Sequence, residues 1–156
     1  MTITNEMKVG LSVIGASIAV FGGSIGYYSY NQQDHSDYAK VATAHPQQAF
    51  EKVVKQNVPA IVVFYSHDCA DCLSVQGPVS RTIAKEQENS NFKYVVADKV
   101  ETGTKFLKDN GVTETPTFQV RKGTDIIYSY SGTDKKHITN ILKGINPDTE
   151  QPFEIQ

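Results

Sequence analysis

The chain contains two cysteines, in the sequence Cys69-Ala70-Asp71-Cys72. They follow a continuous apolar run, residues 58–65, and begin a segment whose apolar residues recur with helical spacing. On the first turn of a helix, this spacing brings two sulfurs close enough to form a disulfide. The first sulfur lies beside free backbone N–H groups at the positive end of the helix dipole, which favours its thiolate. The pair therefore indicates thiol–disulfide exchange, with Cys69 as nucleophile and Cys72 as resolving thiol.

Two other uses of the cysteine pair also fit the residues. A passive structural disulfide is one, and the two cysteines by themselves do not exclude it. Half of a zinc site is the other, with His67 and Asp71 as further ligands, but these residues are too crowded along the chain for a typical ligand set. Because the chain has two cysteines, a four-cysteine zinc site and a multi-disulfide scaffold are excluded. We expect no metal here.

Charged neighbours are expected to modulate the ionisation of the pair. Asp68 and Asp71 flank the nucleophile and disfavour its thiolate. A protonated His67 and the helix dipole act in the opposite direction, so the net effect stays open. From the two carboxylates we hypothesise a disulfide that is less oxidising than those of strong disulfide donors.

The overall composition limits the number of domains and the kinds of partner. A chain of 156 residues holds one ordinary domain with limited additions. Its 15 lysines and arginines are balanced by 17 aspartates and glutamates, and the sequence pI is about 6.1. This balance provides no basic field for nucleic acid, which we do not expect as a partner. The sequence also lacks a phosphate-binding glycine loop and a Ser/His/Asp set.

Apolar periodicity predicts helices and strands that position the cysteine pair. Phe50, Val53 and Val54 recur with helical spacing after Pro46, which suits the first position of a helix. The run at 58–65 is typical of a buried central strand. The same reasoning predicts helices over 45–57, 72–88, 102–110 and around 138–142, and further strands over 92–97, 117–121 and 126–131. This order predicts an α/β sandwich with a mixed sheet, antiparallel across its final hairpin.

The N-terminal residues 9–30 contain no charged side chain and reach the length of about 20 residues that a transmembrane helix needs. Tyrosines gather at the C-terminal end of this stretch, and Lys8 places positive charge before it. We expect a single-pass anchor with a cytoplasmic N-terminus and an extracytoplasmic C-terminal domain. A cleaved signal peptide is the alternative, although the one good Ala-x-Ala site, residues 42–44, lies far beyond the apolar run. Both interpretations export the domain.

The chain is thus divided into five segments of different character. They are a cytoplasmic N-terminus at residues 1–8, a transmembrane anchor or signal peptide at 9–30, a linker at 31–44, a folded domain at 45–146 and a polar tail at 147–156. The linker is expected to be exposed because its residues are small and polar.

Three stretches of this sequence resemble the thioredoxin superfamily. IVVFYSHDCADC, residues 61–72, resembles that family's strand running into its CxxC helix, and Pro78 lies near the family's helix-kinking proline. GVTETPTFQV, residues 111–120, looks like the segment in which a cis-proline faces the two sulfurs. KGTDIIYSYSG, residues 122–132, resembles the terminal hairpin. The resemblance implies a thioredoxin-like three-layer sandwich around a central mixed sheet, preceded here by one transmembrane helix.

The resemblance also implies a substrate-binding edge. Thr115-Pro116 would be joined by a cis peptide bond, and the backbone of Thr115 would pair with an extended substrate strand. Gly132 would lie at the substrate-facing edge of the hairpin. No cofactor is implied beyond the redox-active disulfide of Cys69 and Cys72.

The sequence departs from the family at three places around the motif. Asp68 stands where the family usually has tryptophan, and Ala70-Asp71 stands where it usually has Gly-Pro. Val63 corresponds to the buried acid that cytoplasmic thioredoxins carry before the motif. The proton relay that depends on this acid is therefore missing.

Taken together, the sequence predicts a membrane-anchored, extracytoplasmic thiol–disulfide oxidoreductase that acts on cysteines of exported proteins. Its expected partners are protein thiols and disulfides, a redox partner protein that sets its resting state, and the membrane. The alternative is a non-catalytic thioredoxin-fold component of a secretion, conjugation or peptide-export machinery, which would use the fold for docking.

Overall fold

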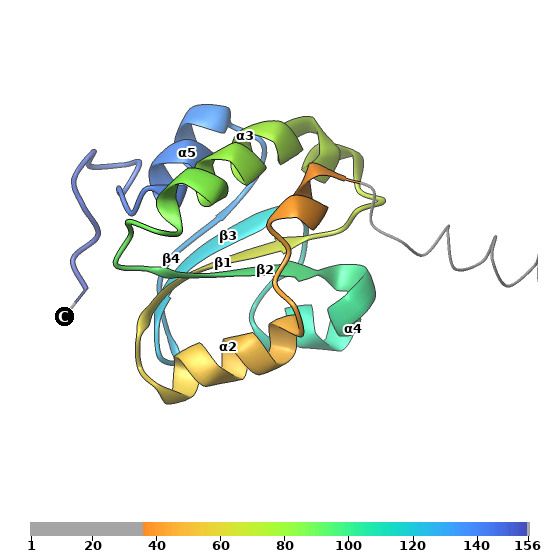
Figure 1. Ribbon diagram of the computed structural model, residues 1–156, viewed down its shortest axis with the longest axis horizontal. Coiled ribbons are helices and arrows are strands. Elements are labelled where there is room, and N and C mark those ends of the chain that lie inside the picture. Colours follow the sequence, from red (N-terminus) through yellow and green to blue (C-terminus); the bar gives the residue numbers. More distant parts are fainter. Residues whose placement is uncertain (1–35, 156) are drawn as a thin grey trace, which may run out of the picture. The chain divides into compact units, whose positions relative to one another are not determined.

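A computed structural model describes residues 36–155 as a sheet covered by helices on both faces (Figure 1). In chain order the elements are η1 (Asp37–Lys40), α2 (Pro46–Lys55), β1 (Pro59–Tyr65), α3 (Ala70–Glu86), β2 (Lys93–Asp98), α4 (Lys99–Asp109), β3 (Thr117–Lys122), β4 (Asp125–Ser131) and α5 (Lys135–Leu142). Within residues 36–155, no helix has both the length and the apolar character needed to cross a membrane. The predicted anchor at 9–30 lies outside the described residues.

The sheet is mixed, as the sequence predicts, with strand order β2-β1-β3-β4. β1 runs parallel to β2 and antiparallel to β3, and β3 and β4 form the final hairpin. In this register Tyr65 at the end of β1 lies opposite Asp98 at the end of β2. The beginning of β3 lies at the same end of the sheet, because Phe64 is opposite Thr117. One end of the sheet thus gathers three chain segments.

The two faces of β1 explain the three layers. Successive side chains of a strand point to opposite faces, so the alternating residues of an apolar run pack against different helices. Ile61, Val63 and Tyr65 join a core with residues of η1, α3 and α5, whereas Val62 and Phe64 join a core with residues of α2 and α4. Figure 1 shows α3 and α5 on one face of the sheet and α2 and α4 on the other. The continuous apolar run is therefore buried on both sides.

Two helices begin earlier than the sequence predicts because polar side chains cap them. α3 begins at Ala70, where the sulfur of Cys69 accepts a hydrogen bond from the Cys72 N–H as an N-cap. α4 begins at Lys99, because the Asp98 carboxylate accepts a hydrogen bond from the backbone N–H of Val100. Both caps lie at the same end of the sheet.

Residues 36–44 differ from the exposed linker that the sequence predicts. η1 lies within this segment, and its Tyr38 side chain is fully buried. The Tyr38 ring stacks on that of Tyr65, with 4.2 Å between centroids and 17° between planes. The backbone N–H of Asp37 donates to Gln76 Oε1 at 2.7 Å and ties η1 to α3. A large aromatic ring among polar residues thus draws part of the segment into the core.

The C-terminal residues also differ from the expected polar tail. Phe153 is buried and belongs to the same core as Cys72. Its N–H donates to the Gly144 carbonyl at 2.9 Å, and Ile145 forms an isolated antiparallel bridge with Pro152. The segment therefore folds back over the hairpin, where the Phe153 ring lies 5.5 Å from that of Tyr128.

Candidate active site

The cysteine pair lies where β1 passes into α3, at the end of the sheet that gathers three segments. Cys69 is half-buried, whereas Cys72 is completely buried within the core. Both are free thiols, and their sulfurs are 2.6 Å apart. The sulfurs are therefore close enough to combine into a disulfide with small side-chain movements.

Hydrogen bonds distinguish the two sulfurs. Cys69 Sγ accepts from the backbone N–H of Cys72 at 3.2 Å and from the Cys72 thiol. Its own thiol donates to the carbonyl oxygen of Thr115 at 3.4 Å. Two donors directed at this sulfur and an acceptor beside it distinguish Cys69 from Cys72. This sulfur is also the one that a substrate can reach.

Cys72 has the opposite environment. Burial, together with its hydrogen bond to Cys69, raises the pKa of the Cys72 thiol from its ordinary value of 9.0 to about 12. Val63, at the place of the family's buried acid, is fully buried in the same apolar core. Cys72 is therefore protonated at neutral pH.

Thr115 and Pro116 lie beside the nucleophile and are joined by a cis peptide bond, as the resemblance implied. The Pro116 carbonyl accepts a hydrogen bond from the N–H of Gly132 at 3.3 Å, which joins the start of β3 to the end of the hairpin. Gly132 has φ of 150°, and a Cβ there would lie 2.7 Å from the Tyr130 hydroxyl. The structure thus brings Thr115, Pro116 and Gly132 together, with Thr115 in contact with Cys69.

His67 and Asp68 project from the turn between β1 and α3. The Nδ1 atom of His67 lies 2.5 Å from Oδ2 of Asp98, in a pair whose side chains are only 14% and 9% exposed. The Ser66 hydroxyl donates to the exposed Asp68 carboxylate, and this bond lowers the pKa of Asp68. Lys99 also lowers it through its positive charge. Asp71 is exposed on the first turn of α3.

Two residues at this site are not found by sequence reasoning. Asp98 directly follows the predicted strand 92–97, and this position at the end of a strand was the available signal. Tyr38 gives no such signal, because it lies in a short polar segment. Burial and the nearby cysteines raise the pKa of Tyr38, and its hydroxyl has no hydrogen-bond partner within residues 36–155.

This arrangement is suited to two-electron thiol chemistry. An accessible thiol lies against a buried one, and the partly exposed backbone segment at Thr115 lies against the accessible thiol. In the part of the chain that the structure describes, no three His, Cys, Asp or Glu side chains form a group that could hold a metal ion. The chemistry that these residues support is therefore disulfide exchange.

The sequence matches the profile of one known protein family. The sequence profile described as Thioredoxin matches residues 41–144. No curated protein sequence matches the chain significantly.

Several solved structures are similar in fold. Oxidised mitochondrial thioredoxin 3 from Saccharomyces cerevisiae is 22% identical, with a TM-score of 0.55, and the match covers 69% of this chain and 98% of that one. A thioredoxin from Plasmodium falciparum is 19% identical, with a TM-score of 0.53 and coverages of 62% and 90%. The germline-specific thioredoxin Deadhead from Drosophila melanogaster is 17% identical, with a TM-score of 0.53 and coverages of 65% and 95%. At these identities the likeness shows a shared fold.

Proposed function

Because the chain belongs to the thioredoxin family, we propose that it is a membrane-anchored thiol–disulfide oxidoreductase that acts on cysteines of exported proteins. The observation that carries the proposal is the contact of one half-exposed sulfur with two groups. Cys69 Sγ lies 2.6 Å from the buried sulfur of Cys72 and 3.4 Å from the Thr115 carbonyl. A nucleophile, its resolving thiol and a substrate-docking backbone thus meet at one point.

The exchange reaction proceeds in two steps. In the first, the Cys69 thiolate attacks one sulfur of a substrate disulfide, that S–S bond breaks, and the released substrate thiolate takes up a proton. In the second, Cys72 loses its proton and attacks Cys69 Sγ in the mixed disulfide, which releases the second substrate thiol. The Cys69–Cys72 pair is oxidised by two electrons and the substrate disulfide is reduced to two thiols. The same steps in reverse oxidise a substrate dithiol.

The environment of Cys72 controls the second step. Its buried thiol holds its proton at neutral pH, since its pKa is about 12. Formation of the mixed disulfide consumes the Cys69 thiolate, so Cys72 then has an electrophilic sulfur beside it in place of a hydrogen-bond acceptor. The resolving thiol therefore stays protonated until Cys69 is bonded to substrate.

Thr115 supports docking of an extended substrate chain. It is partly exposed in the loop before β3, and its neighbour Pro116 has no N–H that could compete for a partner. Leu73, 38% exposed on the first turn of α3, adds apolar surface next to the cysteines. A substrate strand that pairs with Thr115 would pass directly over Cys69.

The location of the domain outside the cytoplasm is supported by the sequence of residues 9–30. This stretch has no charged residue and has the length of a membrane span. Outside the cytosol disulfides persist, so a CxxC protein there has substrates and needs a redox partner protein to set its resting state.

Trapping of mixed disulfides tests the enzymatic function. In Cys72→Ser the second step is blocked, so we expect covalent adducts with cellular proteins that disappear on reduction. Cys69→Ser is the matched control and should form none, because it lacks the nucleophile. If Cys72→Ser captures no protein, and the purified protein neither reduces nor oxidises a test disulfide, the oxidoreductase function is rejected. Normal cellular function of the double Cys→Ser variant would instead favour the docking role.

Labelling of a single introduced cysteine tests the location. Glu88 is exposed in the turn that follows α3 and lies far along the chain from the motif. In a Cys69→Ser/Cys72→Ser background, Glu88→Cys should react with a membrane-impermeant maleimide in intact cells. Reaction only after the cells are lysed would show that the domain is cytoplasmic and would refute the proposed location.

A further inference from the structure

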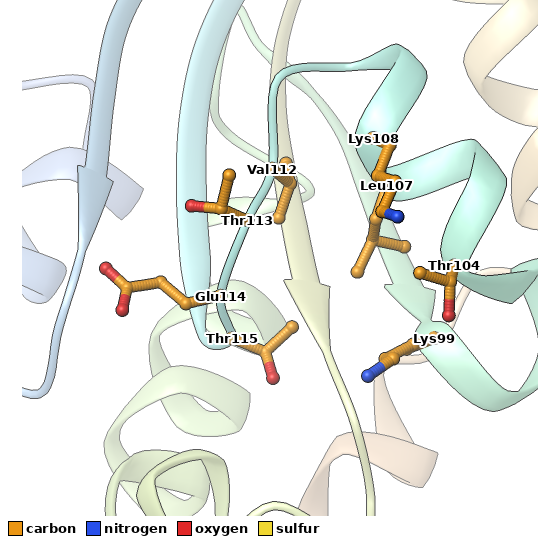
Figure 2. Close-up of a pocket in the computed structure, with 8 residues that line it drawn as sticks. All are labelled: Lys99, Thr104, Leu107, Lys108, Val112, Thr113, Glu114 and Thr115. Atoms are coloured by element: carbon orange, nitrogen blue, oxygen red, sulfur yellow. The ribbon is translucent and has the colours of Figure 1, made fainter.

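A pocket of about 240 Å³ adjoins the candidate active site on the side of α4. Figure 2 shows it between α4 and the loop that leads into β3. Leu107 and Val112 are its buried apolar members. The other lining residues are polar or charged: Lys99, Thr104, Lys108, Thr113, Glu114 and Thr115. This volume lies below the range of pockets for drug-sized ligands and has room for one amino-acid side chain.

Two lysines dominate the charge of this pocket. Lys99 and Lys108 both line it, and neither has an ion-pair partner within residues 36–155. Glu114 is the one acid in the lining, and Figure 2 shows its carboxylate turned away from both lysines. The formal net charge of the chain is −2, so this local excess of positive charge does not follow from the overall composition. The positive charge of the two lysines favours binding of an anionic group in this pocket.

The pocket and the nucleophile share residues. Thr115 lines the pocket and also accepts a hydrogen bond from the Cys69 thiol through its carbonyl oxygen. Lys99 lines the pocket, and its charge acts on Asp68, the residue directly before Cys69. A chain that pairs with Thr115 while its sulfur meets Cys69 therefore passes the mouth of the pocket.

The spacing of an extended chain limits which substrate residue enters. Residues of a strand rise by about 3.3 Å each and alternate between faces, so the neighbours within two positions of the attacked cysteine lie next to Thr115. Asp71 lies on the first turn of α3 and repels an acid on that side of Cys69, whereas the two lysines attract it on the α4 side. Asp68 interacts electrostatically with Lys99, but in the lining itself two lysines are present with a single acid. These charges thus favour a substrate orientation in which its acidic side chain lies on the α4 side of Cys69.

We propose that this pocket is a specificity subsite for an acidic substrate side chain, an Asp or Glu within two residues of the cysteine that Cys69 attacks. The inference rests on the proposed oxidoreductase function and adds the class of substrate. Lys99 and Lys108 bind the carboxylate, and the apolar floor contacts the methylene groups of the same side chain.

Matched peptide disulfides test the subsite. Each peptide carries one cysteine in a mixed disulfide with an aromatic thiol whose release is coloured, and either Glu or Gln at one of the four positions within two residues. The reduced full chain in nonionic detergent should react about threefold to tenfold faster with the Glu peptide at one position or more. This preference should shrink as salt rises from about 0.05 to about 0.5 M.

Variants assign the preference to the pocket. In Lys99→Gln/Lys108→Gln the ratio of the Glu and Gln rates should fall to about one. The charge-retaining Lys99→Arg/Lys108→Arg should keep a preference, which guards against a folding defect in the first variant. Lys52→Gln/Lys55→Gln makes the same change in net charge at exposed positions of α2 and should keep both the rates and the ratio.

The outcomes separate the subsite from the function on which it rests. Equal rates for Glu and Gln peptides at all four positions would overturn the subsite and leave the oxidoreductase function standing. A preference that persists in Lys99→Gln/Lys108→Gln would overturn it as well. If no peptide of either kind is reduced, the proposed function fails, and the subsite fails with it.

Discussion

The two cysteines differ more in their surroundings than in their positions along the chain. Cys69 is half-exposed and accepts two hydrogen bonds at its sulfur, whereas Cys72 is fully buried and donates both of them, one from its backbone N–H and one from its thiol. Exposure makes the first a nucleophile that substrates can reach. Burial keeps the second protonated, so that it reacts only after Cys69 has formed a mixed disulfide beside it.

The pH dependence of resolution follows from this burial. Burial raises the pKa of Cys72 above its ordinary value of 9.0 and persists in the mixed disulfide, so the thiolate fraction continues to grow by about tenfold per pH unit beyond pH 9. A mixed disulfide of Cys69 with a small thiol should release that thiol at a rate that climbs from pH 7 to about pH 11. Stopped-flow measurement of the release provides the check, with Cys72→Ser as the control that releases none. A plateau at or below pH 9 would contradict the assignment.

The carboxylates beside Cys69 should lower the reduction potential. Asp68 keeps a lowered pKa and is ionised at neutral pH, where it disfavours a neighbouring thiolate and so the reduced state. Asp68→Asn should therefore make the disulfide more oxidising, by a shift on the order of 10 mV, because the group is exposed and Lys99 offsets it. Asp125→Asn, at the exposed start of β4, is the control. A shift toward more reducing potentials in Asp68→Asn would refute this sign.

At the scale of elements, the site is made by the ends of strands. The cysteines follow the end of β1, Asp98 is the last residue of β2, and Thr115 lies in the loop before β3. The order and type of these elements are predictable because their apolar residues recur with a regular period. Their caps are less predictable, since a cap depends on one side chain, and Cys69 and Asp98 both extended a helix beyond its periodic part.

Short elements without periodicity escape sequence reasoning. η1 has four residues, too few for an apolar period, and a single aromatic residue carries its packing. Phe153 does the same for the C-terminal segment. Lone aromatic residues within polar stretches therefore mark the two places where the observed boundary of the fold differs from the expected one.

Substitution of Tyr38 tests how much η1 contributes to the free energy of unfolding. Its ring is fully buried against Tyr65, so Tyr38→Ala should lower the free energy of unfolding by about 3–5 kcal/mol. Tyr38→Phe is the matched control and should change it by less than about 1 kcal/mol, because the hydroxyl has no hydrogen-bond partner within residues 36–155. Urea denaturation gives both values. If the two variants were equally stable, packing of the ring on the core would not be the stabilising contact.

At the scale of the whole molecule, sequence and structure agree on the fold class because several independent signals coincide. A CxxC pair after a buried strand, a Thr-Pro segment before another and a final hairpin define one topology together. The pairing of His67 with Asp98 could not be predicted in the same way, because 31 positions separate them and only the parallel register brings them together. The lysine pocket likewise depends on how α4 meets the loop before β3.

A redox titration of the Cys69–Cys72 pair decides whether the two cysteines form a redox centre. The protein is equilibrated in glutathione and dithiothreitol buffers, its free thiols are alkylated, and the added mass is counted, with the double Cys→Ser variant as the blank. We expect a single two-electron transition at a potential clearly more reducing than about −120 mV, the value of a strong disulfide donor. A pair that shows no transition across these buffers would contradict the claim that Cys69 and Cys72 form a redox centre.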